Sequence, residues 1–136
     1  MTTWLTATLL SLLSFGLWGF FTKLAINYID SKSALIFQTV GVLLVGIITL
    51  SLVNFKPAIA PKGIGFGLLT GLAYGVGCLF YFMAASRGKV STVVTLTALY
   101  PLITIILSYF LLQESISLRQ CLGVALALLS IFLMSA

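Results

Sequence analysis

The sequence predicts an all-α integral membrane protein, folded as a five-transmembrane-helix bundle. Of its 136 residues, 61% are hydrophobic and only 7% are charged, whereas roughly 25% are charged in an ordinary soluble domain. The few charged residues separate five long uncharged runs, and these runs show no sustained alternation of apolar and polar positions. Because an open strand edge in lipid leaves backbone groups without partners, helices are the expected spanning elements.

The uncharged runs have the lengths of membrane-spanning helices. They cover residues 1–22, 33–55, 63–86, 90–113 and 120–136. A helix rises 1.5 Å per residue, so about 20 apolar residues cross a hydrocarbon layer of roughly 30 Å. Four runs exceed this length and the fifth lies at its lower limit. The connections are short, so we predict a single transmembrane domain over residues 1–136.

The first run contains a candidate cavity residue and is followed by a lysine. No Lys or Arg precedes this run, so we expect it to remain as a helix rather than to be removed as a signal peptide. Trp18 lies well inside it, where an aromatic ring with a polar edge suits a cavity wall. Lys23 follows near the helix end. Its ammonium group either extends to the interface or contacts a substrate, and the sequence leaves both interpretations open.

The third run carries a small-residue face and an aromatic face. Gly67, Gly71 and Gly75 repeat every four residues, and this spacing permits close helix contact in lipid. We predict helix packing there, either within one chain or between two chains. Tyr81 shares another face with Tyr74 and Cys78 and is a candidate for the cavity wall.

The fourth run combines a polar stripe with a central proline. Thr97, Pro101, Thr104 and Ser108 follow at spacings typical of one helical face. Pro101 removes a backbone donor and leaves the Thr97 carbonyl without its helical partner, so a kink is expected. We predict that Thr97, Pro101 and Thr104 line a cavity together with Trp18 and Tyr81. The alternative is a structural kink whose hydroxyls bond back to their own helix.

Several functional classes lack their residues. The chain has no histidine, two carboxylates far apart, and two cysteines that lie in apolar runs. Metal sites, disulfides and the usual hydrolytic centres are therefore not expected, and we predict neither enzymatic activity nor a cofactor. The formal net charge is +5, but the basic residues do not form a stripe that could follow nucleic acid. The expected surroundings are the lipid bilayer and its anionic headgroups.

The positive residues are nearly balanced across the membrane. Three lie on the side of the N-terminus, Lys56, Lys62 and Arg119, and four lie on the other side, Lys23, Lys32, Arg87 and Lys89. Orientation normally follows an excess of such residues on the cytoplasmic side. With an odd number of helices and almost no excess, we hypothesise that the chain inserts in both orientations and that two opposed copies pair. Alternatively, the chain inserts in a single orientation, because Lys23 lies in the membrane and does not count among the positive residues of the loops.

Three segments, taken in order, also resemble a known family. They are Leu17–Phe21 with Lys23-Leu24-Ala25; Tyr81–Ala85 with Gly88 and Ser91; and Ala98–Leu102 with Leu112-Gln113-Glu114, Gln120 and Gly123. Together they resemble the EamA-type domain of the drug/metabolite transporter superfamily along nearly the whole chain. Two positions depart from the pattern, because Gln113 and Ser130 stand where the family often has glycine.

The resemblance implies a transporter that moves small metabolites or drugs by alternating access in the cell (inner) membrane, without a bound cofactor. The family's usual protein carries two such domains in inverted orientations, whereas this chain supplies one. An antiparallel homodimer, or a paralogous partner chain, would restore the second half. The alternative function is that of a non-transporting membrane subunit, which binds or regulates a larger membrane partner through its glycine face.

Overall fold

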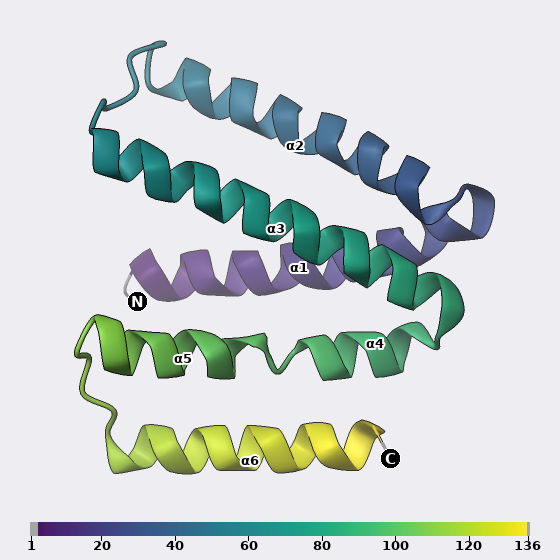
Figure 1. Ribbon diagram of the computed structural model, residues 1–136, viewed down its shortest axis with the longest axis vertical. Coiled ribbons are helices and arrows are strands. Elements are labelled where there is room, and N and C mark those ends of the chain that lie inside the picture. Colours follow the sequence, from purple (N-terminus) through teal and green to yellow (C-terminus); the bar gives the residue numbers. More distant parts are fainter. Residues whose placement is uncertain (1–2, 136) are drawn as a thin grey trace. The chain divides into compact units, whose positions relative to one another are not determined.

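The computed structural model describes residues 3–135, and all of the regular structure in this range is helical. The prediction of an all-α fold is confirmed for this part of the chain. In the described range six helices follow one another (Figure 1): α1 (Thr3–Tyr28), α2 (Ser31–Leu52), α3 (Pro61–Arg87), α4 (Val90–Thr97), α5 (Tyr100–Leu111) and α6 (Leu118–Ser135). They form two compact units, Met1–Arg87 and Gly88–Ala136.

Four helical stretches have the length and apolar composition needed to cross a membrane. They are α1, α2, α3 and the stretch Val90–Leu111, which contains both α4 and α5. The last helix, α6, has 18 residues and therefore extends for about 27 Å, slightly less than the hydrocarbon thickness. Its role as a fifth span stays a prediction.

The first unit is a three-helix assembly whose core lies at one end. In it, α2 and α3 pack against each other and α1 packs against both. The buried side chains lie where α1 ends, α2 begins and α3 ends, and they are Thr22, Ala34, Cys78, Tyr81, Phe82 and Ala85. Toward the opposite end the apolar side chains are exposed. Specific packing within this unit is therefore concentrated at the α1–α2 turn.

The α1–α2 turn is set by an aspartate cap. Asp30 precedes α2, and its carboxylate accepts hydrogen bonds from the backbone amides of Lys32 at 3.0 Å and Ser33 at 3.1 Å. These amides have no partner within the helix, so the cap supplies one. The Ser33 hydroxyl also donates to the carboxylate. The hydrogen bonds from the Ser33 side chain and backbone stabilise the charged form and lower the pKa of Asp30 below its ordinary value.

Asp30→Ala is expected to lower the Tm in a pH-dependent way. Because the pKa of Asp30 is depressed in the folded protein, the carboxylate's contribution to stability is fully present at pH values above 3.8, which is its ordinary pKa. It is lost as pH falls through the lower folded-state pKa. The Tm gap between wild type and Asp30→Ala, followed by circular dichroism in detergent, should therefore be constant near neutrality and narrow in acid. A Tm difference that does not depend on pH would contradict stabilisation of α2 by the charged Asp30 carboxylate.

The second unit contains α4, α5 and α6. Figure 1 shows α4 and α5 following each other along one line, with α6 running back antiparallel beside them, and α4 packs against α6. A reciprocal cap begins α6. The Gln120 side-chain oxygen accepts a hydrogen bond from the backbone amide of Ser117 at 2.8 Å. The backbone amide of Gln120 donates to the Ser117 hydroxyl at 3.3 Å. Cys121, in the first turn of α6, is a free and exposed thiol, whereas Cys78 in α3 is free and buried.

The backbone after α5 explains one departure from the family pattern. Gln113 has φ of 54°, in the left-handed region that glycine occupies without steric cost. Such a residue commonly ends a helix, and glycine is favoured there. A non-glycine residue in a sparsely populated conformation of this kind costs on the order of 1 kcal/mol.

Gln113→Gly is therefore expected to stabilise the protein by about 1 kcal/mol. The matched control is Leu112→Gly, because φ at Leu112 is −97°. Glycine gains nothing at a negative φ and adds entropy to the unfolded chain, so this control should destabilise. Thermal unfolding in one detergent measures both. Shifts of the same sign in the two variants would contradict the backbone argument.

Candidate functional site

Trp18 joins all three helices of the first unit. Its indole nitrogen donates to the Gln38 side-chain oxygen on α2 at 2.7 Å. Its ring lies against Tyr81 on α3, with centroids 4.6 Å apart and planes tilted by 39°. The structure thus brings together two of the predicted cavity residues, Trp18 and Tyr81, and adds an amide from the third helix. We name Trp18, Gln38, Tyr74 and Tyr81 the aromatic–amide cluster.

The remaining polar groups of this cluster are only partly matched. The Gln38 amide nitrogen lies 3.5 Å from the Tyr74 hydroxyl, at the long limit of a hydrogen bond. The Tyr81 hydroxyl is buried and has no hydrogen-bond partner among the described residues. Each of these groups, an amide or a phenol, can both donate and accept. The cluster is therefore polar, uncharged and incompletely satisfied.

Lys23 and Ser31 bind the carboxyl end of α3. The Lys23 ammonium donates to the backbone carbonyl of Ala85 at 3.2 Å, and the Ser31 hydroxyl donates to that of Phe82 at 3.2 Å. A cation near the last carbonyls of a helix offsets their partial negative charge. In the described conformation, Lys23 is half-buried and bonded within the first unit. Its contact with a substrate stays a prediction.

The second unit contains the other three predicted cavity residues, which lie around a break in the helix. The helical pattern stops at Thr97 and resumes at Tyr100, so the chain is interrupted where a kink was expected. The amide of Leu99 bonds the carbonyl of Leu96 at 3.2 Å, three positions back instead of four. Pro101 follows in the first turn of α5, where its missing donor and fixed φ are tolerated.

The hydroxyl of Thr97 bonds to its own helix. It donates to the carbonyls of Val93 at 2.8 Å and Val94 at 3.0 Å, which is the arrangement expected of a structural kink. Thr104 is exposed one turn beyond the break. Whether these residues line a substrate cavity stays a prediction.

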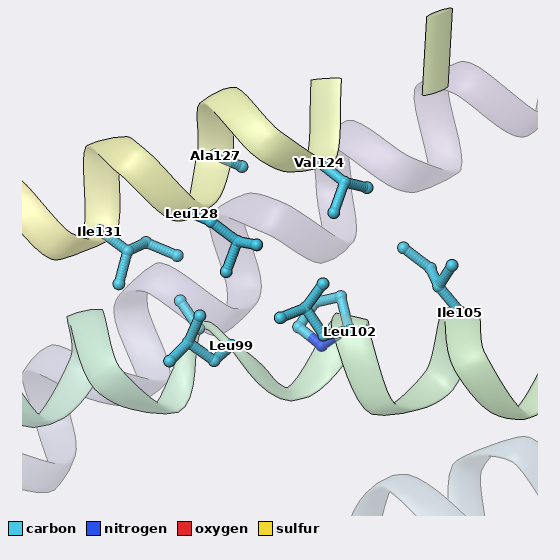
Figure 2. Close-up of a pocket in the computed structure, with 9 residues that line it drawn as sticks. Leu99, Leu102, Ile105, Val124, Ala127, Leu128 and Ile131 are labelled. Carbon is cyan, nitrogen blue, oxygen red and sulfur yellow. The ribbon is translucent and has the colours of Figure 1, made fainter. Parts of the chain in front are cut away.

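Two hollows lie in the second unit, beside α6. The smaller is apolar, at about 100 Å³. Figure 2 shows its labelled side chains from the break, from α5 and from α6, namely Leu99, Leu102, Ile105, Val124, Ala127, Leu128 and Ile131, and Pro101 also lines it. The larger has a volume of about 410 Å³, and its polar lining residues include Thr104, Ser108, Glu114 and Gln120. The smaller hollow thus lies between the break and α6, and the larger one lies between α5, the segment after it and α6.

The predicted glycine face of α3 has no close neighbour among residues 3–135. A methyl group built on Gly67, Gly71 or Gly75 meets nothing within 4 Å. The described helices therefore leave this face open, and its role in packing stays a prediction.

Gln38 is the residue of the cluster that sequence reasoning missed. The run 33–55 contains two side-chain amides, and Gln38 is the one that lies away from the ends of the run, since Asn54 is its last residue but one. An amide inside lipid needs hydrogen-bond partners. That signal was present in the sequence. Its partner on α1, Trp18, became evident only from the packing of the helices.

Comparison with known proteins gives one family and several relatives. The EamA-like transporter family matches residues 2–136. The chain is 33% identical to "Uncharacterized protein MJ1333.1" of Methanocaldococcus jannaschii over 96% of each chain. It is 28% identical to "Glucose uptake protein GlcU" of Staphylococcus xylosus, over 71% of this chain and 32% of that protein. It is 38% identical to "Uncharacterized transporter sll0355" of a Synechocystis strain, over 47% of this chain and 18% of that protein. No solved structure matches the chain.

Proposed function

The chain belongs to the EamA-like transporter family, and from this premise we propose that it moves small metabolites or drugs across the cell (inner) membrane by alternating access. The observation that carries the proposal is the break between α4 and α5 inside the apolar stretch Val90–Leu111. Backbone without regular helical bonds is costly in lipid unless protein or water satisfies it. Interrupted helices of this kind form substrate sites in secondary transporters.

Residues proposed to line a substrate cavity lie in each of the two units. Trp18 and Tyr81 contribute aromatic surface, and Thr97, Pro101 and Thr104 contribute the break and its polar stripe. Lys23 is the charged side chain proposed to contact a substrate. Because it bonds Ala85 in the described conformation, that contact requires the Lys23 ammonium to leave the end of α3.

We propose that two copies assemble in opposite orientations. Five spans, with α6 as the fifth, would place the termini of one copy on opposite sides, and the near balance of three and four positive residues favours neither orientation. The open face of Gly67, Gly71 and Gly75 offers a surface for helix contact between copies. A paralogous partner chain in the opposite orientation would restore the cavity in the same way.

Reporter fusions at the C-terminus test the assembly. Signals from both membrane sides are expected for opposed copies, and a signal from one side alone would require a separate inverted partner. Gly71→Ala provides a second test, because the added methyl meets open space in the single chain. It should leave the folding of one copy intact and weaken crosslinking between copies. Unchanged crosslinking would contradict the contact at this face.

Flux into vesicles tests transport itself. The purified chain should carry at least one small solute in reconstituted vesicles, and glucose is a suitable first solute because of the name of the relative GlcU. If the chain instead purifies only with a larger membrane protein and shows no flux for a broad solute panel, the alternative of a non-transporting subunit replaces the proposal.

A further inference from the structure

The Tyr81 hydroxyl is a buried polar group that lacks a partner. The residue is 6% exposed, and its oxygen is the one buried side-chain oxygen or nitrogen without a hydrogen bond among the described residues. A buried hydroxyl without a hydrogen bond destabilises the folded protein, and native structures seldom retain one without a reason. The missing partner is therefore a feature to be explained.

The residues that contacts connect to Tyr81, first Trp18 and through it Gln38 and Tyr74, carry aromatic rings or uncharged polar groups. The Trp18 ring lies 4.6 Å from the Tyr81 ring, and its N–H group is already used by Gln38. Gln38 extends toward Tyr74, whose hydroxyl lies 3.5 Å from the amide nitrogen. The ammonium of Lys23, one helical turn beyond Trp18, bonds the Ala85 carbonyl instead. A partner for Tyr81 would meet ring faces and neutral groups that both donate and accept.

We infer that the aromatic–amide cluster binds an uncharged, hydroxyl-rich solute, such as a sugar or a polyol. One solute hydroxyl bonds Tyr81, and the apolar face of the solute lies against the Trp18 ring. The inference rests on the proposed transport function and specifies its substrate class. A solute hydroxyl both donates and accepts, as phenol and amide groups do, so it can pair with each member of the cluster.

Other solute classes fit this cluster less well. In the described conformation a carboxylate or an ammonium group would lose its hydration without meeting an opposite charge, because the Lys23 ammonium is bonded to the Ala85 carbonyl. A wholly apolar solute would leave the Tyr81 hydroxyl without a hydrogen bond. In the described conformation the rings of Trp18 and Tyr81 are in contact, so a solute that bonds Tyr81 binds beside the Trp18 ring. Binding should therefore change the fluorescence of Trp18.

The experiment uses the full chain with Trp18 as its single tryptophan. Trp4→Phe provides this background, because Trp4 is 66% exposed and Trp18 is the other tryptophan. Glucose and sorbitol are titrated into the purified protein while emission is recorded, with glycine betaine, choline and gluconate as charged comparators. Saturable changes are expected with glucose or sorbitol and not with the comparators.

Tyr81→Phe then tests the hydroxyl itself. Loss of one hydrogen bond should weaken binding about tenfold. Stability without solute should be unchanged or higher, because the variant removes an unmet polar group, and this separates a binding role from a structural one. Tyr28→Phe is the control, since Tyr28 is 87% exposed at the end of α1, and it should bind like the background.

The outcomes separate this inference from the proposed function. Equal binding by Tyr81→Phe, or a Trp18 response to charged solutes alone, would overturn the inference. So would the absence of any response to glucose and sorbitol. If vesicles carry another solute in any of these cases, the transporter proposal stands. The absence of flux for every solute, despite glucose binding, would instead contradict transport.

Discussion

Replacing Trp18 by alanine is expected to lower the free energy of unfolding by about 3 kcal/mol and to abolish solute flux. The reason is its position, since one side chain connects α1 to Gln38 on α2 and to Tyr81 on α3. Removing the ring leaves a cavity in the packed end of the first unit and frees the Gln38 amide from its shortest contact. Denaturant unfolding in detergent and flux into vesicles measure the two effects.

Two further variants separate the ring from its N–H group. Trp18→Phe keeps an aromatic ring and removes the donor to Gln38. It should lower the free energy of unfolding by about 1 kcal/mol and leave a folded protein with reduced flux. Trp4→Ala makes the same truncation at an exposed position and should change unfolding by less than about 0.5 kcal/mol. If Trp18→Ala behaves like Trp4→Ala, the cluster does not hold the unit together.

Pro101→Ala is expected to reduce flux strongly while stabilising the helix. The substitution restores an amide that can donate to the Thr97 carbonyl, so α4 and α5 can join into one helix. A proline inside a helix costs about 3 kcal/mol, so its removal favours the joined form by up to that amount. If transport uses the broken form, its population and the flux should fall by as much as about a hundredfold.

Hydrogen exchange provides the structural readout for this variant. In a joined helix, the amides from Ala98 to Leu102 should become protected, and the Tm should not fall. Pro57→Ala is the matched control because Pro57 lies in the connection between α2 and α3, and it should leave flux unchanged. Full flux in a Pro101→Ala protein with protected amides would show that transport does not need the break.

The positions of the helices along the sequence were largely predictable, because charged residues separate apolar runs long enough to form helices. Lys and Asp residues mark the ends of α1 and α2, and the pair Arg87 and Lys89 separates α3 from α4. The interruption at Pro101 was expected as a kink, and its extension to a full break was not. Covalent geometry identifies the missing donor, but it does not determine how far the two halves separate.

The site was less predictable because contacts between helices depend on rotation about each helix axis. Trp18 and Tyr81 were selected separately by residue type, and the structure places their rings together. Gln38 was not selected, although its amide completes the contact. The sequence leaves two interpretations of Lys23, and neither includes the Ala85 carbonyl, because the contact between Lys23 and the end of α3 depends on how α1 packs against α3.

The different surroundings of the two cysteines make the natural chain suitable for spectroscopy. Cys121 is exposed in the first turn of α6 and Cys78 is buried in α3, so a bulky maleimide dye should attach to the former and spare the latter. A label on α6 would report environmental changes near the larger hollow without any engineered residue. Movements of the second unit during a transport cycle can thus be followed in the unsubstituted protein.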